Sequence, residues 1–166
     1  FERDHLFPFG LLREPLRRLK KSDLLFVIKE NPFTPLSLIV EELKQQSFPR
    51  YVVAEQQCSG WIDVHGCATT PPVKRLALFS AIARPERVVV LLKSMGYEMV
   101  DTFFLGDHEA LLSKNFSTWA HYWHRKGVAV VGTEKDWARH VRWPQDLQFC
   151  SFMQVDLAIL LGEERI

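Results

Sequence analysis

From Arg75 onward, the sequence alternates short apolar runs with longer stretches whose apolar residues recur at helical spacing. Apolar runs of this kind are typical of strands that are buried on both faces of a sheet. Strands that alternate with helices of about 11–16 residues imply parallel crossover connections. The sequence therefore predicts an α/β fold in which helices flank a mostly parallel sheet.

The expected strands are bounded by breaks and polar residues. They lie at Leu24–Lys29, Tyr51–Gln57, Trp61–Gly66, Arg75–Ser80, Tyr97–Leu105, Val128–Gly132 and Leu147–Met153. The second and third of these flank Cys58-Ser59-Gly60, which predicts a short β-hairpin or ribbon. The Pro71-Pro72 pair marks a break before the regular alternation begins.

Helices are expected between these strands from their start and stop signals. They are predicted over Pro35–Gln46, from Pro85 to Gly96, along the apolar stripe from Leu112 to Trp123, and near Lys135–Arg139. Thr34 is the expected N-cap of the first helix, with Pro35 at its first helical position. Gly96 and Gly127 are expected to end the second and third helices.

Composition narrows the function classes. The 166 residues are 47% hydrophobic and 25% charged, with a net charge of +1. This is a globular composition of about one domain's length, without the bulk positive charge that would indicate nucleic-acid binding. No apolar run reaches the roughly 18 residues needed to cross a bilayer, and the start lacks a signal-peptide pattern. Because the first residue is Phe, we expect the chain to be a fragment.

The cysteines and histidines form no recognisable metal or disulfide pattern. Cys58, Cys67 and Cys150 include no CxxC pair, so we expect small packing residues in a reducing compartment. His121 and His124 form an i,i+3 pair without a third ligand, and we expect them to face solvent. No metal site is predicted.

The turn after the Val128–Gly132 strand is the first candidate site. Gly132 is followed without a spacer by Thr133, Glu134, Lys135 and Asp136. Thr133 and Asp136 fit the start signal of a helix, so local capping is the favoured interpretation of this turn taken alone. The alternative is a ligand site, because parallel strands present ligand-handling groups at their carboxyl ends. Lys135 could then bind a phosphate, while Glu134 and Asp136 orient it or bind Mg²⁺ through water.

Two further polar clusters follow or precede apolar runs. Asp107 and His108 form a general-base arrangement only if another group orients the imidazole, and a helix cap is the simpler interpretation. Arg13 could clamp a phosphate or carboxylate, and Glu14 could hold that arginine or a metal-bound water, while an exposed charge network with neighbouring arginines is the simpler interpretation. The chain contains no G-x-x-x-x-G-K-[ST], G-x-G-x-x-G or G-x-S-x-G motif. If the protein uses a nucleoside triphosphate, the phosphate cradle lies outside these residues.

Four segments of the chain resemble, in the same order, the motifs of one known family. FPFGLLREPLRRLKKSDLL is similar to that family's LREP segment, and FSAIARPERVVVLLKSMGY to its AGIAxPER segment. FLGDHEAL resembles its FPDHHxF motif, and VAVVGTEKDWARH its TEKD motif. Each motif alone is weak, but four in the same order are specific, and they span nearly the whole chain. The chain therefore resembles the tetraacyldisaccharide 4'-kinase (lipid A 4'-kinase) family.

The resemblance implies a P-loop kinase. The family transfers the γ-phosphate of MgATP to the 4'-hydroxyl of a tetraacyldisaccharide 1-phosphate, giving lipid IVA at the cytoplasmic face of the inner membrane of Gram-negative bacteria. This chain then corresponds to the Rossmann-like C-terminal portion, with residues 1–70 as the end of the N-terminal lobe plus a linker or hairpin, and 71–166 as the C-terminal α/β lobe. Mg²⁺ and ATP are expected in the full-length enzyme, and none bound by this fragment alone.

The resemblance also implies site residues and partners. His108 matches the histidine that forms the catalytic base with an aspartate of the P-loop lobe, and Asp107 matches the acid beside it. Arg13 and Glu14 match the pair near the nucleotide, and Thr133–Asp136 match a turn that faces the interlobe cleft. The expected partners are the lipid disaccharide and, peripherally, the inner membrane, with no nucleic acid and a monomeric state.

The chain departs from the family pattern at several positions. Glu109 replaces the second histidine of the DHH motif, and Ala81 replaces the glycine of AGI. Neither removes a residue with an implied role. Two other classes stay open from the residues alone, namely a non-catalytic α/β binding or regulatory module and a sugar-nucleotide glycosyltransferase lobe.

Overall fold

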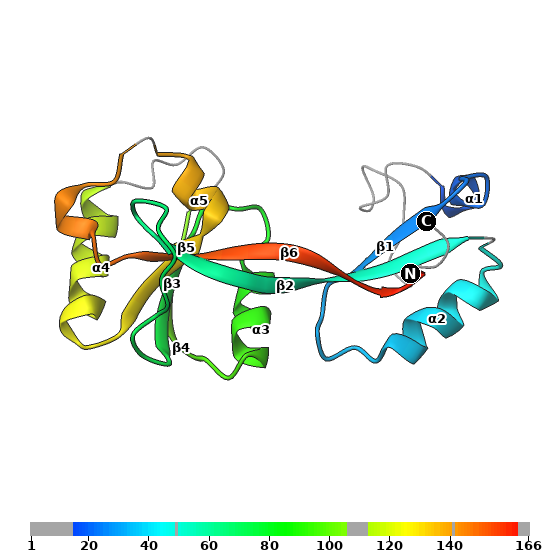
Figure 1. The fold of residues 1–166 in the computed structure, drawn as a ribbon, viewed down its shortest axis with the longest axis horizontal. Helices are drawn as coiled ribbons and strands as arrows, with labels where there is room; N and C mark the ends of the chain where they lie inside the picture. The colour runs from blue at the N-terminus through cyan, green and yellow to red at the C-terminus, as the bar shows by residue number, and fades with distance from the viewer. Residues whose placement is uncertain (1–14, 49, 106–112, 141, 163–166) are drawn as a thin grey trace. The chain divides into compact units, whose positions relative to one another are not determined.

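The chain folds into helices and a six-stranded sheet (Figure 1). In the computed structural model, the described residues are 15–48, 50–105, 113–140 and 142–162. The strands are β1 (Leu25–Lys29), β2 (Tyr51–Asp63), β3 (Arg75–Ser80), β4 (Glu98–Phe104), β5 (Ala129–Thr133) and β6 (Ser151–Leu161). The helices are α1 (Leu16–Leu19), α2 (Leu36–Gln45), α3 (Glu86–Ser94), α4 (Lys114–Arg125), α5 (Glu134–Ala138) and the 3₁₀ helix η1 (Gln145–Leu147).

The strand order is β1-β2-β6-β5-β3-β4. The β1–β2, β3–β4, β3–β5 and β5–β6 pairs are all parallel. The predicted α/β class with a mostly parallel sheet is therefore confirmed. Among the described helices, none is long and apolar enough to cross a membrane.

The chain forms two compact units that interleave along the sequence. Unit 1 consists of Phe1–Lys29, Thr34–Glu55 and Ala158–Ile166, and unit 2 of Glu30–Phe33 and Gln56–Leu157. Strands β2 and β6 each contribute residues to both units. The division at residue 70 into parts of two kinase lobes stays a prediction.

Unit 1 is built on the parallel pairing of β1 with β2. Leu43 of α2, Phe48 and Val53 form its core, because the apolar stripe of the helix packs on one face of these strands. Lys29 and Glu55 lie opposite each other in the strand register and form an ion pair of 2.8 Å. Local apolar spacing and strand pairing therefore account for the core of this unit among its described residues.

Unit 2 buries both faces of its sheet, as the continuous apolar runs predict. Every residue of β5 is buried. Phe79, Phe116 and Phe152 lie in the core on the α4 face, whereas Leu92 and Met153 lie in the core on the α3 face. Figure 1 shows α3 and α4 on opposite sides of the strands of this unit.

The predicted hairpin turn at Cys58–Gly60 is wrong, because β2 continues through it as one strand of 13 residues. A Cβ added at Gly60 would lie 3.3 Å from Oε1 of Gln154 on the neighbouring strand. Gly60 therefore marks a close approach between β2 and β6 within an extended strand, which is the other common use of a strand glycine. The ribbon is formed by two strands that are distant in sequence.

A tight turn does occur directly after β2. The Asp63 carboxylate accepts hydrogen bonds from the backbone N–H groups of His65 (2.8 Å) and Cys67 (2.9 Å). Gly66 has a φ of +79°, a conformation that glycine adopts without strain. Ile62 then forms an antiparallel bridge with Ala68. The local turn signal was thus the Asp-x-x-Gly of this segment.

Two other local predictions need correction. The last strand, predicted at Leu147–Met153, begins at Ser151 and runs to Leu161. Leu147 instead ends the 3₁₀ helix η1, and its carbonyl accepts a hydrogen bond from the Cys150 N–H at 3.1 Å. Thr34, the predicted N-cap of α2, does not cap the helix. Pro35 occupies the N-cap position, and α2 has no side-chain capping hydrogen bond.

The cysteines and the α4 histidines also differ in part from expectation. All three cysteines are free; Cys150 is buried as expected of a packing residue, but Cys67 is exposed. His124 is exposed and stacks on Phe149, whereas His121 is half-buried and lies 3.1 Å from the Asp146 carboxylate.

Candidate functional site

The turn from β5 into α5 is a complete capping box. The Thr133 hydroxyl accepts a hydrogen bond from the Asp136 N–H (3.3 Å), and the Asp136 carboxylate accepts one from the Thr133 N–H (3.2 Å). The Thr133 hydroxyl also donates to the same carboxylate at 2.7 Å. The capping interpretation of Thr133 and Asp136 is therefore confirmed.

Asp136 also joins this turn to the end of β3. It is fully buried, and it accepts hydrogen bonds from the Ser80 hydroxyl and the Ala81 N–H, both at 2.9 Å. Together with those from Thr133, these bonds satisfy a carboxylate that would otherwise be costly to bury. Asp136 thus positions two neighbouring loops.

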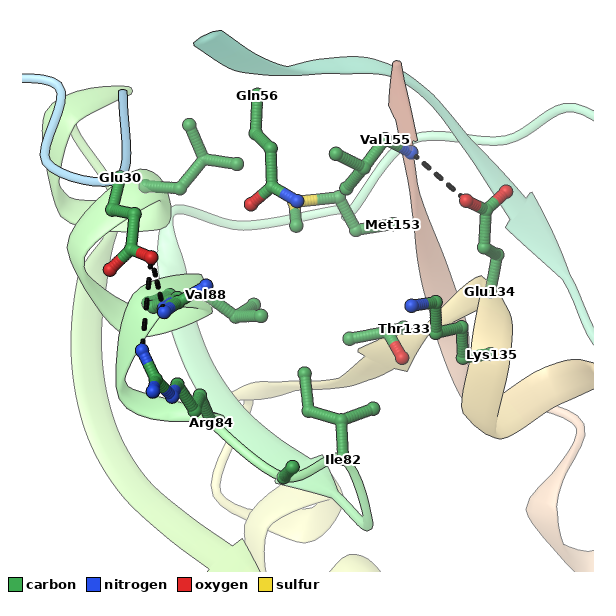
Figure 2. Close-up of a pocket in the computed structure, with 13 residues that line it drawn as sticks. Glu30, Gln56, Ile82, Arg84, Val88, Thr133, Glu134, Lys135, Met153 and Val155 are labelled. Carbon is green, nitrogen blue, oxygen red and sulfur yellow. Dashed lines mark hydrogen bonds and ion pairs between the residues drawn. The ribbon is translucent and has the colours of Figure 1, made fainter. Parts of the chain in front are cut away.

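A cavity of about 500 Å³ lies beside these loops (Figure 2). It is lined by Glu30, Gln56, Ile82, Ala83, Arg84, Arg87, Val88, Leu91, Thr133, Glu134, Lys135, Met153 and Val155. Figure 2 shows Lys135 extending from the start of α5 toward the cavity, while Glu134 turns toward β6. Asp136 is not among the lining residues. Three members of the predicted turn therefore meet the cavity, and the fourth supports it from within the protein.

The topology of unit 2 explains why a cavity forms here. β3 lies between β4 and β5. After β3 the chain continues into α3, which packs on one face of the sheet. After β5 it continues into α5, and Trp137 of α5 packs against the core on the opposite face. Adjacent parallel strands whose connections leave toward opposite faces open a crevice at their carboxyl ends, where α/β proteins bind ligands. The cavity occupies this crevice.

Charged side chains line the cavity unevenly. Glu30 forms ion pairs with both Arg87 and Arg84, the latter at 3.7 Å. Oε1 of Glu134 accepts a hydrogen bond from the Val155 N–H at 3.4 Å. Among the residues that the structure describes, none forms an ion pair with Lys135. Within the described part of the chain, no ion pair therefore competes with a ligand for its ammonium group on this side of the cavity.

The described residues offer no metal site. Within the described ranges, no three His, Cys, Asp or Glu side chains gather closely enough to hold a metal ion. Asp136, which the sequence made a candidate for a water-mediated Mg²⁺ contact, has its oxygens engaged by donors of the protein. For the Mg²⁺ implied by the family resemblance, the described residues therefore show no cluster of three such ligands.

Four predicted site residues lie outside the described residues. These are Arg13, Glu14, Asp107 and His108. Their roles stay predictions, and the structure places only Thr133–Asp136 of the predicted set.

Sequence reasoning missed the arginines and the glutamate of the cavity. Arg84 and Arg87 flank the start of α3, and Glu30 lies in a loop more than fifty residues earlier. Two arginines at a helix N-terminus are a usable signal, because the helix dipole disfavours positive charge there. Glu30 carries no such local signal, since its partners are distant in sequence.

Comparisons with known proteins agree on one family. A family model described as tetraacyldisaccharide-1-P 4'-kinase matches residues 1–165. The tetraacyldisaccharide 4'-kinase of Pelodictyon phaeoclathratiforme is 25% identical over 174 residues, which cover 99% of this chain and 49% of that protein. The Chlorobaculum tepidum protein of the same name is 31% identical over 146 residues, which cover 87% and 41%. The chain thus spans about half the length of the curated relatives it matches.

The fold also matches a solved structure, that of LpxK from Aquifex aeolicus in complex with ATP. The TM-score is 0.59 with 16% sequence identity, over 97% of this chain and 46% of that one. At this identity, the likeness concerns the fold.

Proposed function

Because the chain belongs to the tetraacyldisaccharide 4'-kinase family, we propose that the protein containing it transfers the γ-phosphate of ATP to the 4'-hydroxyl of a tetraacyldisaccharide 1-phosphate, forming lipid IVA. The observation that carries this proposal is the match of the family model over residues 1–165, nearly the whole chain. The fold likeness to a structure solved with ATP supports it. The activity is that of a longer protein, since the chain spans about half of its relatives.

In this proposal, His108 supplies the part of the catalytic base that this chain contributes, with Asp107 beside it. Arg13 and Glu14 lie near the nucleotide, and Thr133, Glu134 and Lys135 face the reaction cleft. Phosphoryl transfer depends on positioning and on charge neutralisation more than on covalent chemistry. A base assembled from two lobes would form only on closure, which limits wasteful ATP hydrolysis.

The proposal extends to cofactors and surroundings. The full-length protein uses ATP and Mg²⁺, acts on a lipid disaccharide, and meets the cytoplasmic face of the inner membrane peripherally. It works as a monomer and has no nucleic-acid partner. We expect no productive binding of MgATP by the 166 residues alone, because they lack a Walker-type loop.

The direct test is transfer of labelled phosphate from ATP to the disaccharide lipid by the full-length protein. His108→Ala is expected to lower kcat by about 10²–10⁴, the usual contribution of a general base. His124→Ala is the matched control, because His124 is exposed and stacks on Phe149 rather than lining the cavity. Unchanged turnover in His108→Ala would reject the base role, and no transfer by the wild-type protein would reject the kinase activity.

A further inference from the structure

We propose that the cavity between the β3 and β5 loops is a subsite for a phosphate group that is attached to an apolar body. The proposal deepens the proposed function, on which it relies for the source of that phosphate. Three cationic side chains, Arg84, Arg87 and Lys135, line the cavity against two acidic ones. The cavity thus has one positive charge in excess, which favours an anionic ligand.

Lys135 is the first phosphate contact. Its side chain extends toward the cavity from a turn that the Asp136 hydrogen bonds hold in place (Figure 2). Within the described ranges it has no acidic partner, and Glu134 beside it accepts the Val155 N–H. A compact ammonium group on a fixed turn is a common phosphate contact in proteins.

Arg84 and Arg87 are the second contact, and Glu30 holds them in the absence of ligand. One oxygen of Glu30 is shared between the two guanidinium groups. The side chains are partly exposed, at 46% for Arg84 and 30% for Arg87, so an incoming anion can reach them. A phosphate presents more acceptor oxygens than a carboxylate and can replace Glu30 with bidentate geometry. Glu30 therefore competes with the phosphate for the two arginines.

Apart from Gln56 and Thr133, the uncharged lining residues are apolar, which narrows the class of ligand. Ile82, Val88, Leu91, Met153 and Val155 form a hydrophobic wall. A volume of about 500 Å³ lies in the range of small-molecule pockets, large enough for one nucleotide or one phosphorylated sugar. Inorganic phosphate alone would leave this wall uncovered. The ligand is therefore a phosphorylated nucleoside or a phosphorylated sugar with apolar substituents.

Steady-state kinetics of the full-length protein distinguish these two sources. Lys135→Gln and Arg87→Gln are expected to raise one KM about tenfold each, the usual loss for one charge-assisted hydrogen bond, with kcat changed little. If the phosphate belongs to the nucleotide, the KM for ATP rises; if it belongs to the acceptor, the KM for the lipid disaccharide rises. Glu30→Gln is expected to lower the same KM, because it removes the competitor.

Matched controls carry the same charge change outside the cavity. Lys126→Gln lies at the end of α4, and Arg75→Gln lies at the start of β3 in an exposed pair with Glu98. Neither should change either KM. If Lys135→Gln and Arg87→Gln leave both KM values at wild-type levels while remaining folded by circular dichroism, the subsite is rejected.

A binding measurement keeps the subsite testable if the wild-type protein shows no transfer. Adenosine 5'-monophosphate and glucosamine 1-phosphate serve as probes, and their binding to the full-length protein is measured by isothermal titration calorimetry. Binding of either probe that weakens about tenfold in Lys135→Gln, but not in Lys126→Gln, supports the subsite even when the kinase activity is absent. Equal binding by both variants rejects it.

Discussion

His140 is half-buried beside Trp143, and its Nε2 atom has no hydrogen-bond partner among the described residues. Burial is the largest cause that lowers the pKa of His140 below its ordinary value of 6.5, and the charge of Arg139 lowers it further. The negative charge of Asp136 opposes both. The folded chain therefore keeps this imidazole neutral over a pH range in which the unfolded chain protonates it.

This difference predicts an acid-sensitive contribution to stability. Because the folded pKa is the lower one, the contribution is complete above the unfolded value near 6.5 and is lost as pH falls toward the folded pKa. His140→Phe keeps an aromatic ring beside Trp143 but cannot bind a proton. Its melting temperature should fall less than that of the wild-type chain between about pH 7.5 and 5.5. If the melting temperatures of the two proteins fell equally, His140 would not contribute to the acid sensitivity of the fold.

At the level of secondary structure, one carboxylate connects two strand ends. Asp136 lies in α5, yet it accepts hydrogen bonds from Ser80 at the end of β3 and from Ala81 after it. Asp136→Asn keeps the size of the side chain but turns one acceptor oxygen into a donor that faces other donors. We expect a loss of about 2–3 kcal/mol in the free energy of unfolding, measured by urea denaturation.

Asp156→Asn provides the comparison for that measurement, because Asp156 is exposed on β6. It should change the free energy of unfolding by less than about 0.5 kcal/mol. If the two variants were equally stable, the Asp136 bonds would contribute little to the fold. A loss confined to Asp136→Asn would identify the connection between the two loops as a main support of the cavity.

These elements also show what the sequence could predict and why. Gly96 and Gly127 have φ values of +82° and +70° at the ends of α3 and α4, and their local signal was sufficient. Thr133 was likewise predicted as a cap, because a capping box is complete within four residues. Gly60 was wrongly predicted to lie in a hairpin turn, because what favours glycine at this position is the close approach of the Gln154 side chain on another strand. The cavity could not be predicted from local patterns either, because its Glu30–Arg87 ion pair joins segments that are distant in sequence.

For the protein as a whole, the fold and the family could be predicted, but the roles of the four undescribed site residues rest on the resemblance alone. The 166 residues contain no Walker-type loop. We expect this chain by itself to show no phosphate transfer from ATP to the disaccharide lipid, whereas the full-length protein does, in parallel assays at equal concentration. Turnover by the isolated chain would mean that the nucleotide site lies within it.

The interleaving of the two compact units constrains how the chain can be made. Unit 1 takes its last segment, from Ala158 onward, after the whole of Gln56–Leu157 has been used for unit 2. During synthesis from the N-terminus, the sheet of unit 2 therefore leaves the ribosome before unit 1 has all of its strands. Domains generally fold as units as they emerge, so unit 2 is the part that can consolidate first. Unit 1 therefore receives its last segment only after the whole of Gln56–Leu157 has been synthesised.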